Sequence, residues 1–301
     1  MTGLQEATTK FMLYSCLALA ALGCASMGAG GSGGEISVTY AKEVLENYRK
    51  GMEELWDENY LEAEKYFEHV RNNFQFSKYA ALADLRIADA DYGRGKYAEA
   101  FDEYMLFRKF HPNHPAVPYA AYKAALCYYQ QMPERWFFLP PPEERDQAPI
   151  EAAAKYLSRY IAEFGHLENE PAGRDKAAPD KDGEYDVMVG EEQRVSEAER
   201  IADAKKKLAE VRHRLAEHEM YVAEFYWKHD KPKAVVGRLE ALVRDYPGTD
   251  LEVEALSMLA RALIEIGEKD KARKVYERLV ANHPKAPEAD EARRFLKGKN
   301  E

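Results

Sequence analysis

The sequence predicts an all-α protein made of stacked helix pairs, and three observations lead to this prediction. From Tyr40 onward, apolar and small residues recur at helical spacing almost everywhere, and no segment alternates as a strand would. The pattern of small and large residues returns at a fixed interval. Proline-containing turns close the successive units. With 301 residues, of which 46% are hydrophobic, the chain is long enough to bury a sizeable core.

The interval between repeats is 37 residues. A small residue on the first helix of a pair faces a second small residue on the next helix, and a large side chain four positions on fills the groove between them. In the first part of the chain the set Gly51, Tyr60, Ala63, Phe67 and Val70 returns as Ala88, Tyr97, Ala100, Tyr104 and Phe107. Near the end the set Ala223, Pro232, Val235, Leu239 and Leu242 returns as Ala260, Lys269, Ala272, Tyr276 and Leu279. This pattern resembles tetratricopeptide repeats lengthened by three residues, so we expect five tetratricopeptide-like helix pairs in a right-handed solenoid.

Turn residues mark where the helices should stop. Gly95 and Gly267 lie in "GRGKYAEAF" and "EIGEKDKAR", where glycine suits the end of a helix. The segments "FHPNHP", "DYPGTD" and "NHPKAP" end repeats with proline, which cannot continue a helix. These turns divide the chain into three pairs over residues 39–164 and two pairs over residues 193–301.

Two segments break this regularity. Residues 130–149 contain a proline run that cannot be helical, and they interrupt the third pair between residues 120–129 and 150–164. Residues 165–192 are polar and contain Pro and Gly, so we expect a poorly ordered insertion there. A long helix over residues 193–229 follows and begins the fourth pair.

The N-terminus predicts a leader that ends at a cysteine. Residues 11–22 are mostly apolar but too few to span a bilayer, which favours a secretory signal over residues 1–23. The Leu-Gly-Cys ending resembles a bacterial lipobox and implies cleavage before Cys24 and lipidation of that residue, although Ala21 stands where leucine is common. An ordinary signal peptide with an incidental cysteine is the alternative. Residues 24–38 are then a flexible, glycine-rich tether.

Charge and motifs favour a binding protein over an enzyme. The formal charge of -10 argues against broad nucleic-acid binding. Cys127 lies in "AALCYYQQ", which is typical of a small buried group rather than a nucleophile. His111 and His114 sit in a proline turn without further metal-type ligands nearby. Since no nucleophile elbow, phosphate loop or zinc spacing occurs, we expect no catalysis, no metal and no cofactor besides a covalent lipid on Cys24.

Two aromatic segments stand outside the repeat positions. Phe74, Phe76 and Tyr79 lie in the link between the first two pairs, where they could pack between repeats or line a peptide-binding pocket on the concave face. The segment "WFFLPPP", Trp136–Pro142, could cover the core or form an exposed apolar loop for a partner or membrane surface. The sequence leaves both pairs of alternatives open.

Several stretches together are similar to the BamD family, lipoproteins of the outer-membrane β-barrel assembly machine. They are "FQFSKYAALADLRIADADYGRGKYAEAFDEY", "RKFHPNHPAVPYAAYKAALCYYQQ", "RDQAPIEAA" and "VRHRLAEHEMYVAEFYWKHDKPKAVVGRLEALVRDYPGTD". They run in family order and cover most of residues 40–280, and "RLAEHEMYVAEFY" is the most specific. The longer insertion at 165–192 and the glycine-rich tether depart from the family pattern.

The resemblance implies a location and partners. A BamD-like protein is held by its lipid at the periplasmic face of the outer membrane of a Gram-negative bacterium, and Ala25 after the lipidated cysteine agrees with an outer-membrane destination. It binds the POTRA domains of BamA, works beside other Bam lipoproteins, and receives unfolded outer-membrane proteins to promote their folding and insertion. No nucleic acid is expected as a partner.

The resemblance also implies candidate site residues. The client-binding role falls on Phe74, Phe76 and Tyr79, with Arg86 as a partner for a carboxylate. The BamA-binding role falls on the end of the long helix and the following turn. Its candidates, each of which could instead be a solvated polar residue, are Arg214, Glu217, His218, Tyr221, Lys228, His229 and Arg238.

Two other functions compete with this one. A periplasmic tetratricopeptide lipoprotein could serve as a scaffold for peptidoglycan or pilus assembly, although "RLAEHEMYVAEFY" and the interrupted third pair argue against it. A regulatory domain of a cell-wall enzyme would need a catalytic segment, and the polar insertion is the one stretch without a repeat assignment.

Overall fold

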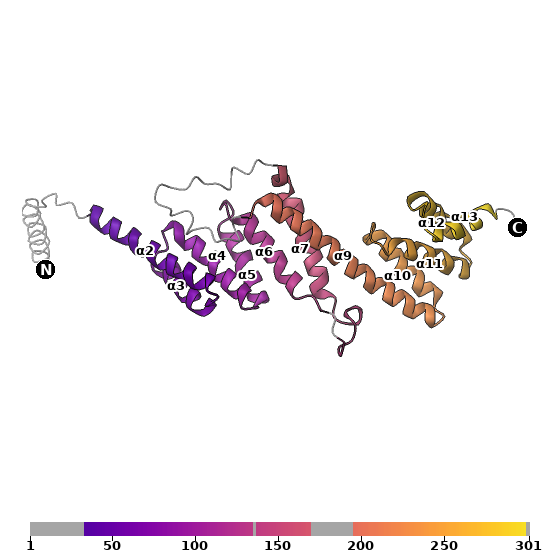
Figure 1. Ribbon diagram of the computed structural model, residues 1–301, viewed down its shortest axis with the longest axis horizontal. Coiled ribbons are helices and arrows are strands. Elements are labelled where there is room, and N and C mark those ends of the chain that lie inside the picture. Colours follow the sequence, from indigo (N-terminus) through magenta and orange to yellow (C-terminus); the bar gives the residue numbers. More distant parts are fainter. Residues whose placement is uncertain (1–32, 135–136, 170–194, 299–301) are drawn as a thin grey trace, which may run out of the picture. The chain divides into compact units, whose positions relative to one another are not determined.

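The computed structural model describes residues 33–134, 137–169 and 195–298, and these ranges contain helices and no strand (Figure 1). The chain from Val44 to Glu301 forms one compact unit, and the residues before Val44 belong to another. The α-helices are α2 (Gly33–Trp56), α3 (Tyr60–Asn73), α4 (Lys78–Gly93), α5 (Tyr97–Phe110), α6 (Val117–Gln130), α7 (Ala148–Phe164), α9 (Glu197–Lys228), α10 (Pro232–Asp245), α11 (Glu252–Glu265), α12 (Lys269–Asn282) and α13 (Glu288–Lys297). The short 3-10 helices are η1 (Pro142–Glu144) and η2 (Gly165–Asn169).

Helices that follow one another in sequence pack against one another. From α3 to α7 and from α9 to α13, each helix contacts the next, and α7 contacts α9 across the insertion. Tyr48 of α2 packs on Phe67 of α3, with ring centroids 5.5 Å apart. The pairs are therefore α2/α3, α4/α5, α6/α7, α9/α10 and α11/α12, and α13 covers the last one. This arrangement confirms the all-α expectation of stacked pairs, while the handedness of the stack stays a prediction.

Four of the five predicted repeat positions are core positions, while the fifth, held by Tyr60, Tyr97, Pro232 and Lys269, begins a helix and is part-buried or exposed. Ala63, Ala100 and Ala272 are completely buried between helices. A Cβ atom on Gly51 would lie 2.7 Å from the ring of Phe67, so this position of α2 cannot hold a larger residue without rearrangement. Helices α3 and α5 begin 37 residues apart, and so do α10 and α12.

The turns within the pairs confirm the predicted helix ends and add a feature that the sequence did not reveal. Gly95 and Gly267 have φ angles of 75° and 84°, the left-handed conformation that glycine adopts at little cost. Their counterparts in the first and fourth pairs are Glu58 and Asp230, with φ angles of 60° and 55°. The turn geometry is thus kept even where the residue is not glycine.

The segment boundaries differ modestly from those expected. Helix α2 begins at Gly33, inside the expected tether, and α9 begins at Glu197 with a capping box between Ser196 and Glu199. The first residues of the expected insertion form η2. Cys24, the leader, most of the tether and residues 170–194 lie outside the described residues. In the part that the structure describes, no helix combines the length and apolar content needed to cross a bilayer.

Helix α9 belongs to two hydrophobic cores. Its residues Ile201, Val211 and Leu215 pack into the core of α4–α7. Its residues Ala216 and Met220 pack into the core of α10–α13. The boundary between the two cores therefore falls inside one continuous helix of 32 residues.

Candidate binding sites

A buried polar network joins the first three helix pairs. Arg86 of α4 donates from Nη1 to Asp89 at 2.5 Å and from Nε to the hydroxyl of Tyr48 at 3.3 Å. Asp89 also accepts hydrogen bonds from Tyr104 at 2.6 Å and Tyr119 at 2.8 Å. Burial alone would lower the pKa of Arg86, but the neighbouring Tyr48 and Asp89 raise it above its usual range. The guanidinium is therefore a fixed positive charge inside the fold.

A groove of about 370 Å³ opens beside this network, and we call it the N-terminal groove. Its apolar wall comes from α2, with Met52, Leu55 and Trp56, of which Trp56 is 48% exposed. Its cationic side comes from Arg86 and from Lys123 of α6, whose Nζ lies 3.8 Å from the ring centroid of Tyr92. The carboxylates of Glu58 and Asp89 also line the groove, so its charge is mixed. An apolar side chain fits its wall, and a carboxylate fits beside its cations.

The predicted client-binding residues do not share one surface. Phe74 and Tyr79 are buried in the core of the first pairs, and Tyr79 packs on Tyr48 with ring centroids 5.2 Å apart. Phe76 is 99% exposed, and Arg86 lines the N-terminal groove. The alternative of packing between repeats therefore describes Phe74 and Tyr79.

Of the residues that line the N-terminal groove, sequence reasoning selected only Arg86 as a site residue, and it missed Trp56 and Lys123 among others. Lys123 carried a usable signal, since it stands 37 residues after Arg86 and is surrounded by apolar residues in "AAYKAAL". A charge at that place in an apolar repeat position indicates a special environment.

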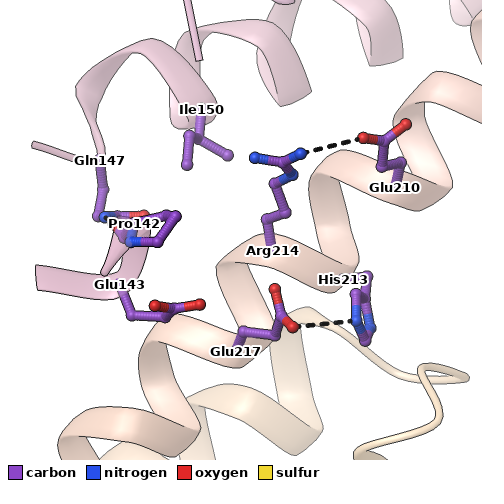
Figure 2. Close-up of a pocket in the computed structure, with 8 residues that line it drawn as sticks. All are labelled: Pro142, Glu143, Gln147, Ile150, Glu210, His213, Arg214 and Glu217. Atoms are coloured by element: carbon purple, nitrogen blue, oxygen red, sulfur yellow. Dashed lines mark hydrogen bonds and ion pairs between the residues drawn. The ribbon is translucent and has the colours of Figure 1, made fainter. Parts of the chain in front are cut away.

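A second cavity, of about 300 Å³, lies where α9 meets η1 and the start of α7 (Figure 2). Figure 2 shows Arg214 and Glu217 of α9 facing Pro142, Gln147 and Ile150 across it. The Nη1 atom of Arg214 donates to the carbonyl of Pro133 at 3.0 Å, and its Nη2 atom lies 3.4 Å from Glu210.

Other contacts hold the interrupted third pair against α9. Nδ1 of His218 lies 2.7 Å from the carbonyl oxygen of Glu143, and the hydroxyl of Tyr221 donates to Glu144. Three of the seven predicted partner-binding residues, namely Arg214, His218 and Tyr221, thus contact the loop between α6 and α7. The sequence could not indicate this, because the contacting residues are far apart in the chain.

The remaining predicted partner-binding residues lie along α9 and at the junction with α10. Glu217 pairs with His213 at 3.4 Å. Lys228 is exposed and lies 3.9 Å from Glu224. His229 packs on the ring of Phe225, with centroids 4.1 Å apart, and Arg238 lies 3.3 Å from Glu219. Lys228 and His229 therefore lie at the junction of α9 and α10, whereas Arg238 lies further along α10 beside Glu219 of α9.

The loop of the interrupted pair is exposed. Phe137 is 98% exposed, and Phe138 and Leu139 are also open to solvent. Of the two alternatives for this segment, the exposed apolar loop describes these residues, while Trp136 lies outside the described residues. Pro142 is the first residue of η1. The carbonyl oxygen of Pro142 accepts a hydrogen bond from the side chain of Gln147 at 2.8 Å.

The other sequence signals have structural explanations. Cys127 is buried, and burial raises the pKa of its thiol to about 12, which leaves it unreactive at neutral pH. His111 and His114 each pack on the ring of Phe107, with centroids 5.2 Å apart. Within the described ranges, no group of three potential ligands could hold a metal ion.

Stacked helix pairs with grooves between them define the class of this molecule as a helical-repeat scaffold. Residues 40–169 and 197–279 match the family YfiO, described as outer membrane lipoprotein. Relatives named outer membrane protein assembly factor BamD match the chain along most of its length. The chain therefore belongs to this family, the BamD family of outer-membrane lipoproteins, as the sequence resemblance predicted.

Two of these relatives indicate how far the similarity extends. The protein from Neisseria meningitidis serogroup A, strain Z2491, is 26% identical over 278 residues, which cover 92% of each chain. The protein from Caulobacter vibrioides is 26% identical over 248 residues, covering 82% of this chain and 68% of the relative. Among solved structures, the TPR2AB domain of yeast Sti1 in its pHSP90 complex covers 85% of this chain and 84% of its own, at 12% identity and a TM-score of 0.37.

Proposed function

We propose that this protein is a lipid-anchored scaffold of outer-membrane β-barrel assembly that binds BamA and unfolded outer-membrane proteins and promotes their folding and insertion. The observation that carries the proposal is the family match, which extends over both groups of helix pairs and leaves out residues 170–196. The relatives are named assembly factors, which favours this function over a scaffold for peptidoglycan or pilus assembly and over an enzyme.

The anchor is the lipid on Cys24, at the periplasmic face of the outer membrane. The tether that follows lets the folded unit stay near the barrel component while its grooves remain accessible. Anchoring also raises the effective concentration of a bound client near the site of insertion. The mechanism is physical throughout, and no covalent step is needed.

The N-terminal groove is the proposed client site. Trp56 and Leu55 would hold an apolar or aromatic side chain of an extended client segment. Arg86 and Lys123 would attract its terminal carboxylate, although Asp89 already neutralises part of the charge of Arg86. Phe76 is exposed in the link between α3 and α4, at the opposite end of α4 from Gly93, and is not part of this site.

The proposed BamA contact uses the exposed end of α9, with Lys228 and His229, together with Arg238 further along α10. Arg214, His218 and Tyr221 would act indirectly, because they position the loop between α6 and α7. Glu217 shares the cavity of Figure 2 with Arg214.

The client site is tested with two peptides of the same sequence that end in phenylalanine, one with a free carboxylate and one amidated. We expect the carboxylate peptide to bind the purified protein more tightly, and Trp56→Ala to weaken it about tenfold. Phe110→Ala is the matched control, since Phe110 is an exposed aromatic residue outside the groove. Equal binding of the two peptides, or equal loss in both variants, would contradict the site.

The BamA contact is tested by pull-down from detergent-solubilised membranes. His229→Glu should reduce recovery of BamA without loss of helicity. Arg244→Glu is the control, because Arg244 is an exposed cation of α10 that pairs with its own neighbour Asp245. Unchanged recovery with His229→Glu would remove the proposed contact.

A further inference from the structure

The two groups of helix pairs carry a groove at the same repeat positions. Helix α10 begins 172 residues after α3, and α12 begins 172 residues after α5. At the same offset, Leu55 and Arg86 of the N-terminal groove correspond to Trp227 and Met258. These two residues line a separate cavity of about 490 Å³ formed by α9, α11 and the start of α13, which we call the C-terminal groove.

The C-terminal groove has a net acidic lining, whereas the lining of its counterpart has equal numbers of cations and carboxylates. Glu224, Glu254 and Glu288 line it. Glu254 and Glu288 have no ion-pair partner among the described residues, and Glu224 lies 3.9 Å from the exposed Lys228. The cation of the lining, Arg261, donates from Nε to Glu291 at 2.9 Å. At the offset of 172 residues, Met258 and Phe295 stand where the first group has Arg86 and Lys123, so the C-terminal groove lacks those two cations.

The apolar part of the C-terminal groove suits a side chain with a cationic end. Trp227 is 39% exposed, and an indole ring is the strongest aromatic partner for a Lys or Arg side chain. Met258 is flexible and polarisable, so it adapts to different side chains. Trp227 also lines a neighbouring cavity of about 250 Å³ that includes Asp230 and Glu265. Space on two sides of Trp227 fits an extended segment better than a compact ligand.

We propose that the C-terminal groove binds an extended cationic segment of a partner protein, with a Lys or Arg side chain over Trp227 and further cations beside Glu254 and Glu288. Charge complementarity selects the occupant, because an acidic groove attracts cationic segments and repels acidic ones. This inference depends on the geometry of α9, α11 and α13 and goes beyond the proposed client and BamA contacts.

The test uses the full folded chain and a labelled peptide of about nine residues in which Lys and Leu alternate, compared with the same peptide carrying Glu for Lys. We expect the Lys peptide to bind by fluorescence anisotropy and the Glu peptide to bind much more weakly. Trp227→Ala and the double variant Glu254→Gln/Glu288→Gln should each weaken the Lys peptide about tenfold.

Matched controls separate the groove from general surface charge. Glu240→Gln/Glu277→Gln removes the same charge from exposed positions on α10 and α12 and should leave binding unchanged. Trp56→Ala should also leave it unchanged, so failure of the N-terminal client site would be distinguishable from failure here. Equal affinity in all variants would overturn the proposal. So would sedimentation showing that the groove variants abolish self-association, since the occupant would then be a second copy.

Discussion

The first three helix pairs and the last two share one repeat but have different interiors. Helices α2–α7 enclose the charged residues Arg86, Asp89 and Lys123, which are tied to several tyrosines. In α10–α13, the buried charged residue among those described is Glu252 at the start of α11. The position that holds Arg86 in α4 holds Met258 in α11. The repeat therefore fixes the small residue at which two helices approach, Ala88 in α4 and Ala260 in α11. The residue two positions earlier, Arg86 or Met258, can differ between repeats.

This difference has an energetic meaning. A buried ion pair is often no more stabilising than apolar residues of the same volume, but removing one partner is costly. The network of the first pairs therefore adds fixed polar contacts between helices rather than stability as such. The core of α10–α13 has a single buried charge of this kind, Glu252, which pairs with the half-exposed Arg278.

The largest expected effect comes from breaking the network in the first pairs. Asp89→Ala removes the carboxylate that Arg86, Tyr104 and Tyr119 contact, and it should lower the free energy of unfolding by about 3–5 kcal/mol. Urea denaturation of the purified chain measures this loss.

The control for Asp89→Ala removes both charges. Arg86→Met/Asp89→Leu makes α4 resemble the apolar α11 at Arg86, and it should recover part of the lost stability, because the unpaired charge is gone although Tyr104 and Tyr119 still lose Asp89 as acceptor. A loss below about 1 kcal/mol in the single variant would mean that water or neighbouring groups compensate for the charge of Arg86.

Overpacking the matched small positions should have a smaller and equal effect in both groups. Ala100→Leu and Ala272→Leu each insert a large side chain into a completely buried position and should cost about 1–3 kcal/mol. Ala98→Leu, at an exposed position of α5, is the control and should change little. An unaltered urea midpoint for either buried variant would contradict the repeat correspondence.

Lowering the pH should change the free energy of unfolding least. The change should have opposite signs for Glu252 in the last pairs and Asp84 in the first pairs. Burial favours a higher pKa for Glu252, but hydrogen bonds from the Gly248 amide and from Arg278 outweigh it and lower that pKa. Glu252 thus stabilises the fold above its unfolded pKa, and this contribution is lost as pH falls through its lower folded pKa. Burial instead raises the pKa of Asp84, so its ionisation costs stability at neutral pH and the cost disappears on acidification.

Two variants separate these contributions. The stability difference between the wild-type protein and Glu252→Gln should shrink as pH falls below about 4. Asp84→Asn should show the opposite trend, with its benefit greatest at neutral pH. Urea denaturation between pH 3 and pH 7 measures both, and parallel curves would contradict the assigned pKa directions.

The sequence predicted what depends on local pattern. The spacing of Ala100 and Ala272 predicted the pairs, and Gly95 and Gly267 predicted two turns, because periodicity and backbone freedom are local properties. The burial of Tyr79 and the contact between Arg214 and the Pro133 carbonyl depend on residues distant in the chain, so no local pattern could indicate them. The sequence did not predict α13 as a helix separate from the fifth pair. By its pattern the segment "NHPKAP" indicates the end of the last repeat, whereas it joins α12 to α13.

The continuity of α9 has a consequence for how this molecule comes apart. Leu215 and Ala216 are neighbours in sequence but belong to different cores. A helix unfolds turn by turn from its ends. If one core unfolds, the half of α9 that packs in the other core therefore loses the helical turns next to it. We expect the chain to melt as one cooperative body, so that damage to either end shortens the lifetime of the whole.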